Sequence, residues 1–124
     1  MPAVEQAIRE SLALGDGMLR GPATHLLDAG GKRLRPALVL LSALCCHYDS
    51  RVVVPAAAAV EMIHMATLIH DDIIDNSSIR RGTPTVNSLW GDKTALLTGD
   101  YLFARAFMMI AGIAPCALKP LSVA

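Results

Sequence analysis

Apolar residues recur at intervals of three or four along most of the chain, the spacing that places them on one face of an α-helix. This pattern predicts helices over residues 3–14, 18–29, 36–46 and 91–111. The longest apolar stretch runs from Pro55 to Asp75 and predicts a helix of about 30 Å, with Pro55 at its first position. The β-branched run 51–54 has no partner strand, so we interpret it as an approach to that helix, and the polar residues 76–85 predict a loop. The chain is therefore predicted to be all-α.

Composition narrows the class of protein to a closely packed helical chain without a nucleic-acid partner. The 124 residues are 53% apolar but only 4% aromatic, which favours helices that approach one another closely. The 11 basic and 11 acidic residues give a formal net charge of zero. This charge balance argues against nucleic-acid binding.

The cysteines and the N-terminus indicate a cytoplasmic location. Cys45, Cys46 and Cys116 form neither a disulfide pattern nor a metal pattern, and they fit a reducing compartment. The N-terminus lacks the basic-then-apolar order of a signal peptide. The first apolar run is too short to span a bilayer and the longer one is interrupted by Glu61 and His64, so no transmembrane segment is predicted.

Three aspartates at the end of the longest predicted helix indicate a metal site. Asp71 and Asp75 are one turn apart and share a face, and Asp72 lies one turn before Asp75. Negative charge is unfavourable there because the helix dipole already places partial negative charge at a C-terminus. A Mg²⁺ ion carrying a phosphorylated ligand would offset it, since proteins hold Mg²⁺ with one or two carboxylates plus substrate phosphates. An ordinary acidic helix end is the alternative.

Two histidines lie on the same predicted helix. His64 falls on the stripe of Asp71, two turns earlier, although a lone histidine is more often a core residue than a ligand contact. His70 lies about 100° round the helix from Asp71. His64 and His70 therefore cannot chelate one metal, and we expect His70 to be structural. Asp100, which follows Gly99, either faces the same cavity or is a buried, hydrogen-bonded aspartate.

Two basic motifs are candidate phosphate-binding sites. Residues 30–36, Gly-Gly-Lys-Arg-Leu-Arg-Pro, place three cations beside two glycines, which let backbone N–H groups approach a ligand. Lysine supplies a point charge and arginine a bidentate fork. A solvated basic turn is an equally favoured interpretation of this motif alone. The second motif, Arg80-Arg81-Gly82, would be an exposed loop by itself, but it follows the aspartates closely enough to share a ligand with a metal held there.

The motifs resemble, in order and spacing, the N-terminal part of the trans-polyprenyl diphosphate synthase family, and look most like its bacterial medium- and long-chain enzymes. The likeness covers about residues 30–107 and is carried by 30–36, His64, 71–75 with 80–82, and 98–102 (Thr-Gly-Asp-Tyr-Leu). It implies an all-α isoprenoid-synthase-type bundle around a central cavity, of which this chain has only the N-terminal helices. It also implies that isopentenyl diphosphate is condensed with an allylic diphosphate to give an all-trans polyprenyl diphosphate.

The resemblance also implies roles for individual side chains. The isopentenyl diphosphate site would comprise Lys32, Arg35, His64 and Arg81. Asp71 and Asp75 would hold Mg²⁺ on the allylic diphosphate, with support from Asp72. Arg80 would bind the same diphosphate and complete the catalytic set with the three aspartates. The family implies a homodimer or heteromer for the complete enzyme.

The chain departs from the family after Asp75. Members carry a second aspartate-rich motif that completes the metal cluster, whereas only Asp92 and Asp100 follow here. We expect residues 1–124 to be the N-terminal part of a polyprenyl synthetase domain, a fragment or truncated product that is inactive alone. The alternative is a non-catalytic or regulatory subunit that binds diphosphate or pairs with a complete synthase. A terpene cyclase relative would share the metal chemistry without needing residues 30–36.

Product length is a further expectation from the resemblance. In the family, bulk just before the first aspartate-rich motif blocks the tunnel into which the product grows. Ala66 and Thr67 occupy those positions and are both small. They predict a medium-to-long-chain product.

Overall fold

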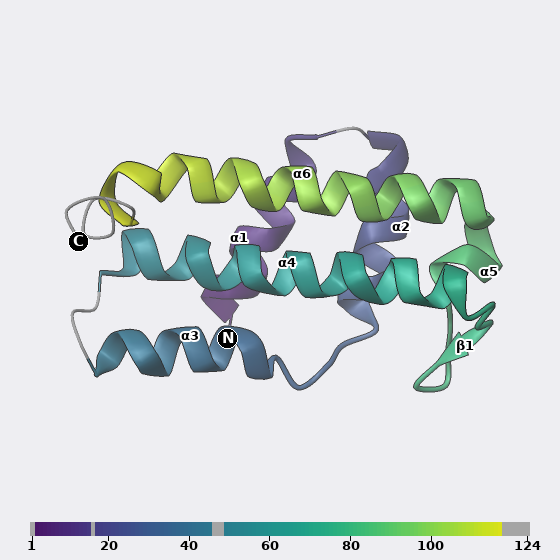
Figure 1. Ribbon diagram of the computed structural model, residues 1–124, viewed down its shortest axis with the longest axis horizontal. Helices are drawn as coiled ribbons and strands as arrows, with labels where there is room; N and C mark the ends of the chain where they lie inside the picture. Colours follow the sequence, from purple (N-terminus) through teal and green to yellow (C-terminus); the bar gives the residue numbers. More distant parts are fainter. Residues whose placement is uncertain (1, 16, 46–48, 118–124) are drawn as a thin grey trace.

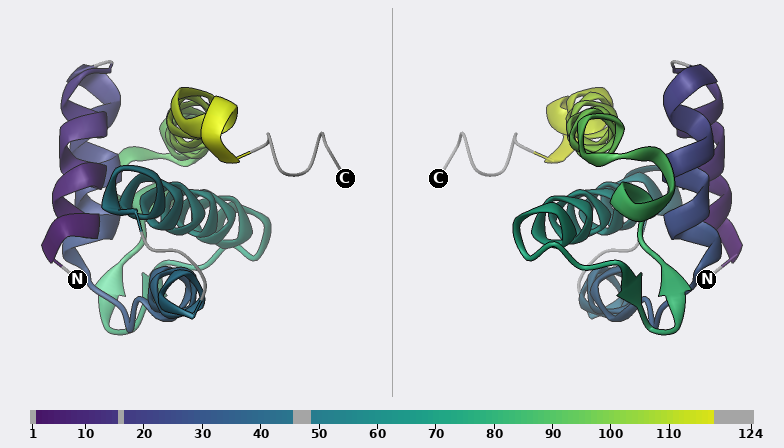
Figure 2. Two further views of the ribbon diagram at one scale, coloured as in Figure 1. Left: turned by 90° about the vertical axis from the view of Figure 1, so that its left-hand side faces the viewer. Right: turned by 90° about the vertical axis from the view of Figure 1, so that its right-hand side faces the viewer.

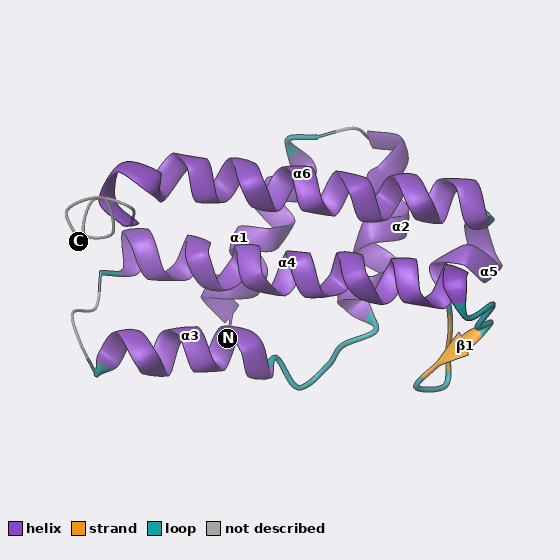
Figure 3. Ribbon diagram, viewed as in Figure 1, coloured by secondary structure: helices purple, strands orange, loops and turns teal. Residues whose placement is uncertain are grey.

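The computed structural model describes residues 2–15, 17–45 and 49–117, which form helices joined by short loops and one small hairpin (Figure 3). The helices are α1 (Pro2–Ala13), α2 (Gly17–Asp28), α3 (Leu34–Leu44), α4 (Ser50–Ile74), α5 (Val86–Trp90) and α6 (Asp92–Ala117). The hairpin pairs β1 (Ile79–Arg80) with β2 (Thr83–Pro84). The all-α prediction is confirmed for the described residues. Cys46 and the side chain of Cys116 lie outside them.

The helices form two layers around α4. Figure 1 shows α3, α4 and α6 side by side with α4 in the middle, and the end-on views of Figure 2 show α1 and α2 against this layer. The core contains alanines that let helices approach closely, including Ala58 and Ala66 on α4 and Ala95 and Ala106 on α6, all fully buried. Closely packed helices are what the many small apolar residues predict.

The central helix begins earlier than the sequence pattern predicts. α4 starts at Ser50, so residues 51–54 are helical and Pro55 lies inside the helix. The reason is the cap: the Asp49 carboxylate accepts a hydrogen bond from the Arg51 N–H at 3.0 Å, which satisfies a backbone donor that the first turn leaves free. α3 likewise starts at Leu34, two residues before Pro36, and ends at Leu44.

The end of α4 matches the prediction and has a clear local cause. Asn76 has φ 52°, in the left-handed region that commonly terminates helices. The Ser77 N–H donates to the Asp72 carbonyl at 3.0 Å, and the Asn76 N–H donates to the Ile73 carbonyl at 3.2 Å. This pair of bonds is a Schellman motif. It fixes the turn that carries the three aspartates.

The segment predicted as a loop over 76–85 contains the hairpin instead. Its two-residue turn, Arg81-Gly82, has positive φ at both positions (52° and 77°), the conformation that suits the twist of a tight hairpin. The last predicted helix corresponds to α6, and the short helix α5 that precedes it was not predicted. Thr85 caps α5 by accepting from the Ser88 N–H, and Gly91 at φ 89° separates α5 from α6.

Several apolar side chains of α3 and α6 face outward. Leu38 and Leu41 on α3 and Phe107 and Met108 on α6 are each about 60% exposed. By length and composition alone, Ser50–Ile74 and Asp92–Ile113 are long and apolar enough to cross a membrane, a test that core helices also pass. Half of the apolar window in α4 is buried within the fold.

Candidate functional site

A pocket opens between the α2–α3 loop, the C-terminal half of α4 and the hairpin. It holds about 850 Å³ of empty space, counted to its open mouth. Its wall contains His64 and all the cations of the two basic motifs, namely Lys32, Arg33, Arg35, Arg80 and Arg81. Cations that lie far apart in the sequence therefore meet at one cavity.

The α2–α3 loop and the first turn of α3 each place one cation toward solvent at the pocket. Lys32 and Arg35 are exposed, and both line the cavity. Gly30 has φ 82°, a conformation in which residues with a Cβ are disfavoured. Gly31 has no Cβ either, and one built there would lie 3.1 Å from Arg33 Nη1 and 3.4 Å from Arg81 Nη1. The two glycines thus let the basic side chains gather closely.

His64 is held next to Arg35. The Arg35 Nη1 group donates to His64 Nε2 at 3.2 Å, so this ring nitrogen carries no proton in that contact. Burial, followed by the nearby Arg35 and then Arg80 and Arg81, lowers the pKa of the His64 imidazole from its ordinary value of 6.5. The ring is therefore neutral near pH 7 while the pocket is without an anion.

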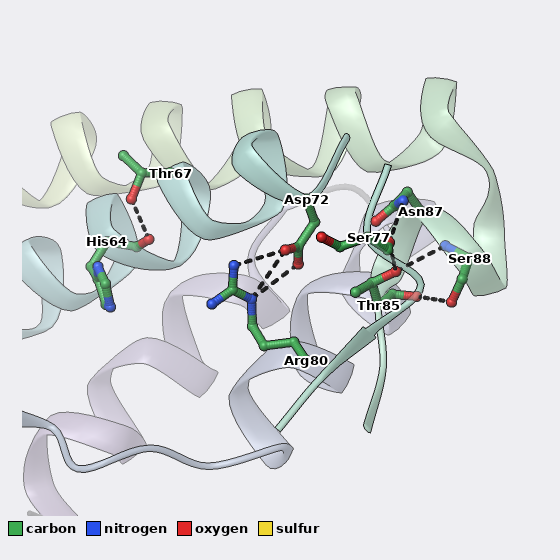
Figure 4. Close-up of polar contacts among 8 residues, drawn as sticks. All are labelled: His64, Thr67, Asp72, Ser77, Arg80, Thr85, Asn87 and Ser88. Carbon is green, nitrogen blue, oxygen red and sulfur yellow. Dashed lines mark hydrogen bonds and ion pairs between the residues drawn. The ribbon is translucent and has the colours of Figure 1, made fainter. Parts of the chain in front are cut away.

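Asp72 and Arg80 form the tightest ion pair of the pocket. The Arg80 Nη2 and Nε groups donate to the Asp72 carboxylate at 2.7, 3.2 and 3.2 Å (Figure 4). The Asp72 side chain is 5% exposed, so the bond holds Arg80 against the end of α4. That hydrogen bond, helped by the charges of Asp71 and Asp75, raises the pKa of the Arg80 guanidinium. Asp72 therefore positions Arg80, whereas Asp71 and Asp75 are exposed to solvent.

Hydrogen bonds from α2 and α5 fix the hairpin. The Thr85 hydroxyl and the Asn87 amide both donate to the Ser77 carbonyl, at 2.8 and 3.0 Å (Figure 4). On the other side, His25 Nε2 lies 2.8 Å from the Pro84 carbonyl, and its ring meets Trp90 edge-on. These contacts hold the strand pair that carries Arg80 and Arg81.

Asp71 and Asp75 lie just outside the pocket wall, at the exposed end of α4. Both are exposed, and neither carboxylate has a hydrogen-bond or ion-pair partner among the described side chains. No three described His, Cys, Asp or Glu side chains converge as a complete metal site. Two unpaired carboxylates one turn apart nevertheless suit Mg²⁺, which takes one or two carboxylates and fills its remaining positions with phosphate and water.

His70 and Asp100 lie between α4 and α6 and do not line the pocket. His70 Nε2 lies 3.2 Å from the Leu96 carbonyl and 3.5 Å from Asp100 Oδ1, and its ring packs over Gly99. Asp100 is exposed, so the buried aspartate, one of the two alternatives that the sequence left open, is wrong. His70 links the two long helices, as expected for a structural residue.

Sequence reasoning missed two contributors to this site. Glu61 is buried and pairs with Arg33, and a single charge inside an apolar helix could have signalled it, because such a charge needs a partner. His25 gave no comparable signal. Of the two residues expected to set product length, Ala66 is fully buried in the core, whereas Thr67 is exposed and donates to the His64 carbonyl at 2.6 Å.

A helical fold with cations and carboxylates gathered at one open pocket is suited to binding diphosphates. A family model described as polyprenyl synthetase matches residues 16–122. The chain therefore belongs to the polyprenyl synthetase family. Its matches to individual proteins agree with this assignment.

Two curated relatives illustrate the likeness in sequence. The chain is 46% identical over 111 residues to heptaprenyl diphosphate synthase component 2 of Geobacillus stearothermophilus, which covers 90% of this chain and 35% of the relative. It is 43% identical over 117 residues to nonaprenyl diphosphate synthase of Mycobacterium tuberculosis, which covers 94% of this chain and 35% of the relative. The chain thus spans about a third of the length of these relatives.

Solved structures share the fold. A decaprenyl diphosphate synthase from Rhodobacter capsulatus superposes with a TM-score of 0.86 at 45% identity, covering 92% of this chain and 35% of that one. A polyprenyl synthase from Caulobacter crescentus, solved with calcium and isoprenyl diphosphate, gives 0.85 at 40% identity, covering 90% and 34%. The predicted isoprenoid-synthase-type fold is therefore confirmed for the described helices.

Proposed function

We propose that this chain supplies the first half of the active site of an all-trans polyprenyl diphosphate synthase. Isopentenyl diphosphate would be condensed with an allylic diphosphate at the pocket. The observation that carries the proposal is the convergence of Lys32, Arg35, His64 and Arg81 on one cavity, beside an α4 end with two unpaired carboxylates. Relatives named as prenyl diphosphate synthases support it.

The two ends of the site would hold two diphosphates by different means. Lys32, Arg35 and Arg81 bind the diphosphate of isopentenyl diphosphate directly, and His64 adds a hydrogen bond at its edge. Asp71 and Asp75 would hold Mg²⁺, which supplies charge stabilisation for the departing allylic diphosphate. The Caulobacter crescentus structure, with its bound calcium and isoprenyl diphosphate, supports a divalent cation and a diphosphate in such folds.

The chain's own residues then stabilise negative charge as it develops. Arg80, fixed by Asp72, would face the leaving diphosphate and needs no reorganisation when the bond breaks. Asp72 acts on Arg80 and does not itself bind the metal in this proposal. The isopentenyl double bond attacks the resulting allylic cation, and the new cation loses a proton to the released diphosphate, so no side-chain nucleophile is required.

We also propose that the protein is cytoplasmic and that the complete enzyme is a homodimer or heteromer. The 124-residue chain alone is not expected to elongate a product, since the sequence has no second aspartate-rich motif after Asp75. A subunit role is the second candidate. It is favoured by the likeness to a relative named as component 2 of a synthase, and by the outward-facing leucines of α3.

A chimera tests the proposed activity. This chain replaces the matching 117 residues of the Mycobacterium tuberculosis nonaprenyl diphosphate synthase, and incorporation of radiolabelled isopentenyl diphosphate is measured with an allylic primer and Mg²⁺. We expect incorporation by the chimera and none by its Arg35→Ala variant. A folded chimera that does not condense the substrates, beside an active parent enzyme, would refute the catalytic proposal and favour the subunit role.

A further inference from the structure

One of the three cations in residues 30–36 is turned into the protein. The Arg33 side chain is 9% exposed, whereas the other two cations of the motif are exposed. Its Nη1 donates to Glu61 and its Nε to Glu5, both at 3.3 Å, and its Nη2 donates to the Leu27 carbonyl at 3.0 Å. One guanidinium therefore ties the loop to α1, α2 and α4.

The unfavourable backbone conformation of Arg33 is stabilised by these side-chain contacts. Its φ of 53° and ψ of 38° lie in the left-handed region, which is unfavourable for a residue with a side chain unless its surroundings hold it. Arg33 immediately precedes α3, and its carbonyl accepts the Ala37 N–H at 3.1 Å. Holding Arg33 therefore fixes where α3 begins. It also fixes Lys32 on one side and Arg35 in the first turn.

The two carboxylates also reduce repulsion within the basic wall. Arg33 and Arg81 both approach Gly31, and like charges so close repel one another. Glu61 and Glu5 offset the charge of Arg33 through their ion pairs with it. The cations that face open space can then gather before any ligand is bound.

We propose that Arg33 is a positioning residue for the isopentenyl diphosphate site, held by Glu61 and Glu5 so that the loop presents Lys32 and Arg35 to the ligand. This inference rests on the proposed function. Nothing in it requires Arg33 to touch the ligand. The competing account is that Arg33 binds the diphosphate itself and the carboxylates only restrain it.

Removing the charge of Glu61 separates the two accounts. Glu61→Gln keeps the size of the side chain and one oxygen acceptor while it deletes a negative charge near an anion site. If Arg33 binds the diphosphate directly, the freed guanidinium and the lost carboxylate should both strengthen binding. If Arg33 is a positioning residue, the loop loosens and binding weakens, by about tenfold for a misplaced set of ligand contacts.

Isothermal titration of isopentenyl diphosphate into the 124-residue chain, without Mg²⁺, measures this effect. Glu10→Gln is the matched control, because it makes the same charge change on α1 at an exposed residue whose partner is Gln6. We expect its dissociation constant to stay within about twofold of the parent. Arg33→Met combined with Glu61→Gln should weaken binding no further than Arg33→Met alone, since both remove the same tie.

Hydrogen exchange supplies a measurement that needs no ligand. Arg33→Met should speed exchange of the amides of residues 30–37 and leave the centres of α4 and α6 protected, because the tie acts on the loop. Unchanged or tighter binding by Glu61→Gln would overturn the positioning role. If the parent chain binds no isopentenyl diphosphate, the proposed function fails, and unchanged exchange in residues 30–37 would then refute the loop tie as well.

Discussion

The packing of His70 against Gly99 predicts that Gly99→Ala destabilises the chain, because the added Cβ would occupy the place of the imidazole ring. A Cβ at position 99 would lie 2.2 Å from His70 Nε2, so Gly99→Ala forces the ring to move. The move breaks the 3.2 Å contact with the Leu96 carbonyl. Overpacking costs about 1–3 kcal/mol, a lost hydrogen bond adds about 1 kcal/mol, and alanine's better helix propensity returns about 1 kcal/mol. The net destabilisation is therefore about 1–3 kcal/mol.

Gly112→Ala is the matched control in the same helix. Nothing lies within 4 Å of a Cβ built there, so the same substitution should stabilise the chain by about 0.5–1 kcal/mol. The two variants should thus differ by about 1.5–4 kcal/mol in the free energy of unfolding.

Urea unfolding followed by circular dichroism measures this difference, which corresponds to roughly 0.8–2 M between the midpoints for a urea slope of about 2 kcal/mol per M. His70→Ala should restore part of the stability of Gly99→Ala, since it removes the clash. Equal midpoints for Gly99→Ala and Gly112→Ala would refute the packing of His70 over Gly99. Because His70 precedes Asp71, the same clash should also displace the turn that carries the aspartates.

Three further predictions concern the site. In the chimera, Asp71→Ala and Asp75→Ala should each lower turnover by orders of magnitude at limiting Mg²⁺, and near-normal steady-state rates would exclude them as metal ligands. Thr67→Phe, at the exposed position beside His64, should shorten the chimera's product, and an unchanged chromatographic profile would count against this. The His64 imidazole should titrate below pH 6.5 in NMR spectra, so its contribution to stability is present above pH 6.5 and is lost as the pH falls through the interval down to its folded pKa. Bound isopentenyl diphosphate should raise that midpoint, and a midpoint that does not move would place the ligand elsewhere.

The aspartates and the helices could be predicted because each depends on local sequence. The end of α4 follows from Asn76, and the shared face of Asp71 and Asp75 follows from helical periodicity. The start of α4 was misplaced because Pro55 suits a first helical position, whereas the Asp49 cap outweighs that preference.

Other features depend on contacts between distant residues. Nothing local distinguishes Arg33 from the two exposed cations beside it, since Glu61 and Glu5 are each 28 residues away in sequence. The hairpin was missed because its two-residue strands are too short to show an alternating pattern. Arg80 therefore became visible as the partner of Asp72 only in the folded chain.

The most direct test of the proposed function is whether the chain binds the two diphosphates at separate sites, one through its cations and one through Mg²⁺. Titration calorimetry of the 124-residue chain should show isopentenyl diphosphate binding without Mg²⁺, and an allylic diphosphate with a longer tail binding only with Mg²⁺. Arg35→Ala should abolish the first and spare the second, while Asp71→Ala should do the reverse. Loss of both binding events in both variants, or metal-free binding that survives Arg35→Ala, would contradict the account.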